Sequence, residues 1–331
     1  MKYLALSHHH GLHSAAYRLL REGHEVQVAS WTQRFKSAWQ GRLDHLDAGE
    51  SKGDRAAAMK LVSEEAAGGE LTVLSDFPLW TELLGNTQSW LFGAGHVLPW
   101  PKPPALGIVA WFDGEQWQAP MWAVCDWGAW PGGLGAPVLG GVTLVQGTRF
   151  PGVLDGLHDP FKASGWKGLV LVGLDYLEAA KELVPTGFQA GWPPLVTDAW
   201  LALVGNFGGV LRGEPPQVAP TTYTVALPVT QPPWPVERAP GPAPVSLAGL
   251  TSDVAKRCFF HDIQLRGGEV WTAGLDGMVA VAVGESRVSE RARSMALAVA
   301  GALPLPQKQF RPDVGGSVPT ALAGLEQLGY W

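Results

Sequence analysis

The stretch KYLALSHHHGLHSAAYRLLREGHEVQVAS, residues 2–30, decides the fold of this chain. Its apolar run at 3–6 predicts a short strand. The apolar residues that follow recur at helical spacing, at Leu12, Ala15, Ala16, Leu19 and Leu20. Gly23 then stands in the left-handed position that commonly ends a helix. Residues 25–29 alternate apolar and polar side chains, which predicts a second strand.

The same alternation of strand and helix continues outward from this stretch. Residues 54–67 have a helical pattern that stops at Gly68 and Gly69, and residues 71–74 form a third apolar run. Strands that alternate with helices predict a parallel sheet with helices packed on it. Ligands of such sheets bind at the carboxyl ends of the strands. The loop at 7–13 is therefore the predicted ligand loop.

The rest of the chain changes character after the proline-rich join at 99–104. The following segment, 107–137, combines short strands with five tryptophans, Trp111, Trp117, Trp122, Trp127 and Trp130. Further strands are predicted at 167–174, 221–227, 270–273 and 277–283. A helix is expected over 286–302, with Val288, Ala292, Met295 and Val299 on one face. We place an N-terminal α/β domain at 1–100, a core at 101–218 and a C-terminal domain at 219–331.

The composition excludes several classes of protein. The 331 residues carry a formal net charge of −6, so a broad nucleic-acid-binding surface is not expected. No apolar run reaches the roughly 18 residues of a membrane span, and the N-terminus lacks the pattern of a signal peptide. The two cysteines, Cys125 and Cys258, fit buried, reduced thiols, and two thiols cannot make a cysteine-rich zinc site. A cytoplasmic location is predicted.

Several segments resemble motifs of one enzyme family. Residues 9–16 follow the outline Gly-Gly-Arg-Glu-His-Ala, with His13 on its histidine. PGGLGAP at 131–137 is similar to Thr-Gly-Gly-Met-Gly-Ala, and GWKGLVLVGL at 165–174 to Gly-Tyr-Lys-Gly-Val-Leu-Tyr-Ala-Gly-Leu. FHD at 260–262, WTAG and MVAV at 271–274 and 278–281, and FRPDVG at 310–315 are similar to Phe-His-Ala-Gly, Val-Thr-Ser-Gly-Gly-Arg-Val-Leu and Tyr-Arg-x-Asp-Ile-Gly. In this order they resemble the phosphoribosylamine–glycine ligases, or glycinamide ribonucleotide synthetases.

The resemblance implies a fold and a chemistry. It implies a Rossmann-like (PreATP-grasp) N-terminal domain with a parallel sheet, an ATP-grasp core and a small C-terminal α+β domain. The family joins glycine to phosphoribosylamine through an acyl phosphate made from ATP, with magnesium and a mobile lid. Here the chain passes from Leu98 almost directly to Gly107, where the family resumes after its lid. A truncated ATP-grasp core without a lid is therefore expected.

The family's metal ligands are also changed. Leu183, Pro185 and Gly187 stand where the family has an acid, an asparagine and an arginine. Magnesium prefers hard oxygen ligands, which leucine and proline side chains do not offer. ATP and Mg²⁺ are expected from the family, but their sites are predicted to be lost. The alternative is a shift of register that recruits Glu182 together with Asp175.

The predicted substrate- and phosphate-binding residues come from two loops and two further positions. Gly132, Gly133, Leu134 and Gly135 would offer backbone N–H groups to an anion, or form a tight turn in which glycine supplies positive φ. His9, His10 and His13 would lie over a ribose phosphate; a metal site would need a third ligand that the sequence does not provide, and a solvated loop is the other alternative. Asp126 and Arg311 complete the set, although Arg311 also fits a structural tie of the C-terminal domain with His261 and Asp313.

The tryptophans and the function each leave alternatives. The tryptophans could stack on a base or sugar, but filling the gap left by the lid, or covering a homo-oligomer interface, is favoured. The first functional hypothesis is a divergent carbon–nitrogen ligase or transferase acting on a phosphoribosyl or modified-nucleotide amine, with glycine as one donor. The others are a non-catalytic nucleotide- or phosphosugar-binding protein, a pseudoenzyme, and a structural oligomer. A nucleic-acid or membrane partner is not expected.

Overall fold

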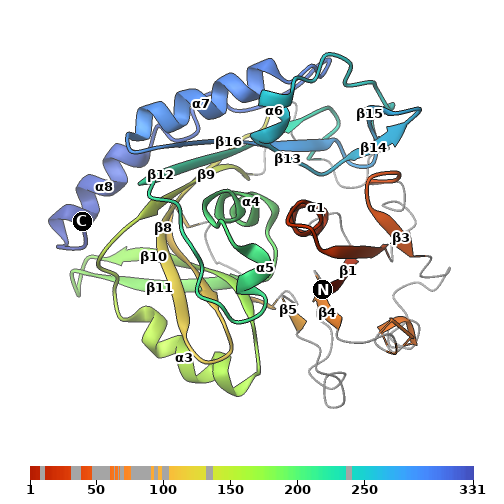
Figure 1. The fold of residues 1–331 in the computed structure, drawn as a ribbon. Coiled ribbons are helices and arrows are strands. Elements are labelled where there is room, and N and C mark those ends of the chain that lie inside the picture. Colours follow the sequence, from red (N-terminus) through yellow and green to blue (C-terminus); the bar gives the residue numbers. More distant parts are fainter. Residues whose placement is uncertain are drawn as a thin grey trace.

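The fold is taken from a computed structural model of the chain. It describes residues 1–7, 12–30, 39–46, 60–62, 64–65, 67, 71–75, 91–92, 96–98, 104–131, 137–235 and 241–331. The protein combines a small parallel sheet with a large antiparallel sheet, in a mixed α/β arrangement (Figure 1).

The small sheet contains the stretch with which the chain begins. Its five strands are parallel and lie in the order β3-β2-β1-β4-β5. Their bounds are β1 (Lys2–Ser7), β2 (Glu25–Ser30), β3 (Asp44–Leu46), β4 (Leu71–Ser75) and β5 (Leu91–Phe92). The predicted strands at 3–6, 25–29 and 71–74 and their parallel order are thus confirmed. Of the helix predicted at 54–67, residues 60–62, 64 and 65 are helical, and most of the others lie outside the described residues.

Helix α1 (His13–Arg21) follows the predicted pattern and packs against this sheet. It ends where predicted, since Gly23 has φ +87° just beyond the C-cap Glu22. Leu20 is exposed, although the sequence pattern places it on the apolar face. The helix is short and is buried by its neighbours at Leu12, Ala15, Ala16 and Leu19.

The large sheet has nine antiparallel strands in the order β13-β16-β12-β9-β8-β7-β10-β11-β6. Their bounds are β6 (His96–Leu98), β7 (Leu106–Phe112), β8 (Trp117–Gly128), β9 (Val138–Gln146), β10 (Gly168–Leu177), β11 (Glu182–Ala190), β12 (Tyr223–Thr230), β13 (Cys258–Phe260) and β16 (Met278–Ser286). A hairpin of β14 (Ile263–Arg266) and β15 (Glu269–Thr272) stands beside it. The helices are α3 (Val153–Ala163), α4 (Pro194–Leu203), α5 (Phe207–Val210), α6 (Ser252–Lys256), α7 (Ser289–Ala302) and α8 (Val318–Gln327).

The sheet crosses both positions at which the sequence places domain limits. Strand β6 precedes residue 100, and β12, β13 and β16 follow residue 218, yet all four belong to one sheet. The limits at 100 and 218 therefore stay predictions. Residues 99–105 connect β6 to β7, and the absence of a lid from the core stays a prediction.

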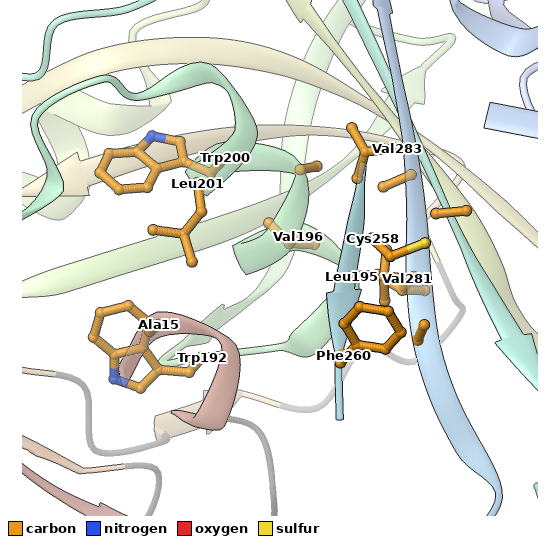
Figure 2. Packing of buried hydrophobic residues seen from close by; sticks show 14 of the residues in the cluster. Ala15, Trp192, Leu195, Val196, Trp200, Leu201, Cys258, Phe260, Val281 and Val283 are labelled. Atoms are coloured by element: carbon orange, nitrogen blue, oxygen red, sulfur yellow. The ribbon is translucent and has the colours of Figure 1, made fainter. Parts of the chain in front are cut away.

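Both faces of the large sheet are covered, so its central strands are apolar on both sides. Along β7, Val109 and Trp111 enter one core cluster, while Ile108 and Phe112 enter the other. Helix α4 packs over β9, β12 and β16, helix α7 packs along β12 and β16 on the side away from α4, and α3 and α8 contribute to the second cluster. Figure 2 shows part of the first cluster, where side chains of α4 meet those of β13 and β16.

The tryptophans of 107–137 mostly fill these cores. Trp111 stacks on Trp200 of α4 with ring centroids 5.2 Å apart, and Trp122 on the other face stacks on Phe150 at 5.2 Å. Trp111, Trp122 and Trp130 are buried within the chain itself, whereas Trp117 and Trp127 are half-buried. A homo-oligomer through this segment stays a prediction.

Helix α7 corrects one detail of the sequence analysis. Val288, predicted on its buried face, is 58% exposed, because it is the extended N-cap residue and precedes the helical turns. The buried face is formed by Ala292, Ala296, Val299 and Ala300. Gly284 of β16 permits this close packing, since a Cβ there would lie 2.1 Å from the carbonyl oxygen of Ala292.

Two remaining expectations concern the thiols and membrane helices. Cys125 and Cys258 are free and buried, and burial raises the pKa of each thiol to about 12, which keeps both neutral. Among the described residues, no helix has the length and apolar character needed to span a membrane.

Candidate functional site

The carboxyl edge of the small sheet gathers three buried hydroxyls. Strands β1, β2 and β4 end in Ser7, Ser30 and Ser75, which are 1%, 3% and 0% exposed. The strands are adjacent and in register, since Ser7 pairs with Ser30 and Leu6 pairs with Ser75. In open α/β sheets this edge is where ligands bind. Residues in register on neighbouring strands point to the same face, so Ser7 and Ser30 share one face, and Ser75, in register with Leu6, points to the other. We call these three serines, which lie at one edge but on two faces, the serine row; they stand at the place the sequence predicts for a ligand.

Ser30 has an unsatisfied hydroxyl in this row. Its Oγ is buried and has no hydrogen-bond partner in the described part of the chain. A buried hydroxyl that lacks a partner is unfavourable, and a bound ligand or water is one way of satisfying it. Buried threonines, such as Thr143, also have unpaired hydroxyls, but Thr143 lies in the middle of β9. What distinguishes Ser30 is its place at the edge of a parallel sheet.

Helix α1 begins directly behind the same edge. Its N-cap residue, Leu12, makes no side-chain capping bond, and its first turn contains no acidic residue. The N–H groups of that turn and the helix dipole favour an anion. His13 is the first helical residue and is fully buried. His9 and His10 lie outside the described residues, so a role of these histidines in ligand binding stays a prediction.

The glycine loop that the sequence analysis selects lies outside the described residues. Gly132, Gly133, Leu134 and Gly135 connect β8 to β9. Immediately before this loop, Trp130 is buried against Trp234 with ring centroids 4.6 Å apart. Anion binding by this loop stays a prediction.

Asp126 and Arg311 are brought together, and their polar groups bind other parts of the chain. Asp126 accepts hydrogen bonds from the N–H of Gly315 at 2.8 Å and the hydroxyl of Ser317 at 2.5 Å. Burial raises the pKa of the Asp126 carboxyl, while these two bonds lower it. Arg311 donates to the carbonyl of Asp126 at 3.1 Å and forms an ion pair with Asp313.

Glycines shape the surface on which Arg311 lies. A Cβ at Gly128 would stand 2.5 Å from Nη1 of Arg311, and one at Gly140 would stand 2.6 Å from its Cδ. The guanidinium therefore rests directly on the backbone of β8 and β9. These contacts dock the segment before α8 onto the large sheet, in line with the structural tie that the sequence offers for Arg311. Substrate binding by Asp126 and Arg311 stays a prediction.

A buried polar network links three distant segments, and the sequence analysis missed it. Asp198 of α4 accepts a hydrogen bond from Ser14 of α1 at 2.7 Å and lies 2.6 Å from Nε2 of His261. All three side chains are almost fully buried, which makes Asp198 a tie between α1, α4 and the residue after β13. The serine and the imidazole bind different oxygens of one carboxylate, so this network is not a nucleophile–base pair.

One signal in the sequence does point to Asp198. It is the single charged residue of PLVTDAWLAL, the segment that forms α4. A charge in an otherwise apolar helix needs a buried partner. The network supports the expectation that His261 has a structural role.

The positions of the family's metal ligands do not fit magnesium. Leu183, Pro185 and Gly187 lie on β11 and supply no side-chain oxygen. Asp175 and Glu182, the alternative pair, lie on the same face near the end of the β10–β11 hairpin, and both are exposed. Within the described ranges, no group of three or more His, Cys, Asp or Glu residues could hold a metal ion.

Comparison with known proteins defines the fold. No protein-family model matches the sequence, and no curated protein matches it. Solved structures that resemble the chain are ligases and carboxylases, and the fold they share with it is that of the ATP-grasp ligases.

Three of these structures show how far the similarity extends. Phosphoribosylamine–glycine ligase from Thermotoga maritima has a TM-score of 0.58 and 12% identity, over 95% of this chain and 100% of that chain. Pyruvate carboxylase from Rhizobium etli has a TM-score of 0.54 and 12% identity, over 99% of this chain and 39% of that chain. L-amino acid ligase from Bacillus licheniformis has a TM-score of 0.50 and 11% identity, over 91% and 98%. At these identities the likeness shows the fold alone.

Proposed function

We propose that this protein binds a phosphorylated sugar or nucleotide at the carboxyl edge of its small parallel sheet. The observation that carries the proposal is the row of Ser7, Ser30 and Ser75, in which the buried Ser30 hydroxyl has no partner in the described residues. The uncapped first turn of α1 beside this row would hold the phosphate, and the Ser30 hydroxyl would bind the sugar. The fold likeness to phosphoribosylamine–glycine ligase supports a phosphoribosyl or modified-nucleotide amine as the ligand.

A second candidate function adds chemistry to this binding. The likeness to a carbon–nitrogen ligase extends over nearly the whole chain, which favours a divergent ligase or transferase that acylates the bound amine. Because the family's metal positions hold Leu183, Pro185 and Gly187, we propose that such an enzyme takes a donor that is already activated. Glycine in activated form is the donor that the resemblance implies.

Calorimetric titration would test the binding proposal. Ribose 5-phosphate and glycinamide ribonucleotide are titrated into the protein, with ribose and glycine as comparisons. Ser30→Ala should weaken binding about tenfold, since one buried hydrogen bond to the ligand is lost. Thr143→Val is the matched control, because it removes a buried, unpaired hydroxyl from the large sheet. Equal affinities of Ser30→Ala and the unchanged protein would contradict the site.

Turnover separates the second candidate from the first. The protein is incubated with a phosphoribosyl amine and a glycyl phosphate analogue, and amide formation is followed by mass spectrometry. Amide formation that Ser30→Ala slows supports the transferase. Tight binding without any amide above the uncatalysed rate supports a protein that only binds.

A further inference from the structure

We propose that a second ligand site, separate from the serine row, lies between α1 and the α6–β13 segment and takes a small phosphorylated molecule. A cavity of about 260 Å³ lies there. The residues that line it come from two separate parts of the chain. They are Ser14, Tyr17, Arg18, Arg21, Trp39, Arg42, Ser252, Ala255, Lys256, Cys258, Phe259 and Phe260. The lining contains four cationic side chains and no acidic one.

The four cations are not equivalent. Arg18 is occupied, because it pairs with Glu22 at 2.7 Å and donates to the carbonyl of Val204 at 3.0 Å. Arg21, Arg42 and Lys256 form no ion pair within the described part of the chain. Three unpaired positive charges around one cavity repel each other, and a bound anion would remove that repulsion. The protein as a whole is acidic, so this concentration of positive charge is local.

An aromatic wall holds one of the three cations in place. The guanidinium of Arg42 lies over the ring of Tyr17, 5.6 Å from its centroid. Tyr17 in turn packs against the buried Trp39, with ring centroids 4.7 Å apart. A guanidinium that rests on an aromatic face keeps its N–H edge free for a planar or tetrahedral anion.

Part of the α6–β13 side, next to Lys256, is apolar and neutral. It consists of Ala255, Cys258, Phe259 and Phe260, and burial raises the pKa of the Cys258 thiol to about 12. Figure 2 shows Cys258 and Phe260 on β13, beside the α4 side chains of the same cluster. A ligand that fits this lining has a phosphate near the cations and a less polar part against the apolar residues.

The size of the cavity limits the ligand. It lies below the range of roughly 300 to 1,000 Å³ that is common for drug-sized ligands. One phosphate on a body no larger than a sugar fits this volume and charge. Arginine binds carboxylate and phosphate alike with two parallel hydrogen bonds, so charge makes the distinction: three unpaired cations suit the nearly double charge of a phosphate monoester better than the single charge of a carboxylate.

The same cations could serve only their helices. Arg18 and Arg21 lie in the last turn of α1, and Lys256 lies in the last turn of α6, where positive charge stabilises the helix dipole. That role does not involve Arg42, which lies outside any helix. A direct binding experiment distinguishes the two roles.

The probes are inorganic phosphate, ribose 5-phosphate and unphosphorylated ribose, titrated by calorimetry at low and raised ionic strength. Phosphate and ribose 5-phosphate should bind, ribose should not, and raised salt should weaken binding. Arg21→Gln and Lys256→Gln should each weaken phosphate binding about tenfold. Arg291→Gln, which removes an exposed arginine of α7 that forms no ion pair in the described residues, should have no effect.

The variant Ser30→Ala distinguishes binding at the serine row from binding at the cationic cavity. Ser30→Ala should leave phosphate binding at the cationic cavity unchanged. Two binding events are expected for ribose 5-phosphate, one that Ser30→Ala weakens and one that Arg21→Gln and Lys256→Gln weaken. If Arg21→Gln and Lys256→Gln leave every binding event at its original affinity, this inference is overturned. An absence of phosphate binding to the unchanged protein at low salt would also overturn it and would leave the cations a role in the helices alone.

Discussion

The carboxyl edge of the small sheet and the β10–β11 hairpin are the two places where the family resemblance expects ligands, and they differ in chemistry. At the edge, three neighbouring strands end in buried serines, and the uncapped start of helix α1 lies behind them. The hairpin carries Leu183, Pro185 and Gly187 at the positions of the metal ligands, and its acids, Asp175 and Glu182, are exposed. The edge thus carries the groups to which the proposed function assigns a phosphorylated sugar, whereas Leu183, Pro185 and Gly187 offer magnesium no side-chain oxygen.

This difference teaches that the parts of a binding fold can change separately. The edge is built from strand ends and backbone N–H groups, which the fold itself supplies. The metal site depends on individual acidic side chains, which single substitutions remove. Four experiments test this difference between the edge and the hairpin.

The largest effect is expected from Asp198→Ala, because Asp198 ties α1 to the large sheet through Ser14 and His261. Removing one partner of a buried pair costs about 3 to 5 kcal/mol of unfolding free energy. Urea denaturation measures this loss. Amide hydrogen exchange should rise more in α1 and β1 than in β10 and β11, and equal rises would contradict a role of Asp198 specific to the edge.

The next largest effect is a pH dependence of stability, and it comes from Asp262, a buried carboxyl that belongs neither to the sheet edge nor to the hairpin. Burial, followed by the nearby charge of Asp276, raises the pKa of Asp262 to about 6, although its Oδ2 accepts hydrogen bonds from the N–H groups of Leu275 and Gly277. A raised folded pKa means that stability is present at low pH and is lost as pH rises towards 6. The neutral variant Asp262→Asn does not have this dependence.

The loss that distinguishes the two proteins amounts to about 2 kcal/mol between pH 4 and pH 7, from a shift of about two pKa units. Denaturation of both proteins across this range measures it. A constant difference between Asp262→Asn and the unchanged protein would contradict the raised pKa. If the unfolding free energy of Asp262→Asn rises relative to that of the unchanged protein as pH increases, the buried Asp262 carboxylate destabilises the fold. That cost comes from burial of the charge and, unlike the unpaired hydroxyl of the serine row, does not point to a ligand.

A smaller effect compares two unpaired hydroxyls. Ser30→Ala and Thr143→Val each remove a buried hydroxyl that has no partner in the described residues, so each should raise the unfolding free energy by about 1 kcal/mol. Thermal denaturation without ligand measures this gain. If Ser30→Ala destabilises the protein instead, its hydroxyl is satisfied within the fold and the serine row is not a vacant site.

The smallest effect is expected at the hairpin. Asp175→Asn combined with Glu182→Gln should leave the melting temperature in ATP and Mg²⁺ unchanged, because both acids are exposed and lie apart from any third ligand in the described residues. A thermal shift series measures this. If ATP and Mg²⁺ stabilise the unchanged protein and the double variant loses that stabilisation, the hairpin is a metal site and the comparison fails.

Local sequence patterns predict much of this fold, since short-range spacing decides α1 and the neighbouring strands. The three strand-ending serines are also visible in the sequence once the strands are placed. The sequence does not predict the Asp198 network, because its partners lie 184 and 63 residues away. Val288 was assigned to a buried face because periodicity alone does not show where the first helical turn begins.

Helix α8 has a consequence for the order in which the protein forms during synthesis. Helix α3 covers part of the second sheet face, where Phe161 packs on Phe112, and Val318 and Leu325 of α8 join the same cluster. Near α8, the ring centroids of Tyr330 and Trp122 lie 5.9 Å apart, so this part of the face waits for α8. The ribosome makes that face about two hundred residues before it makes its cover. A nascent chain therefore exposes an apolar surface over this interval, and a chain cut after residue 317 would keep it exposed and tend to aggregate.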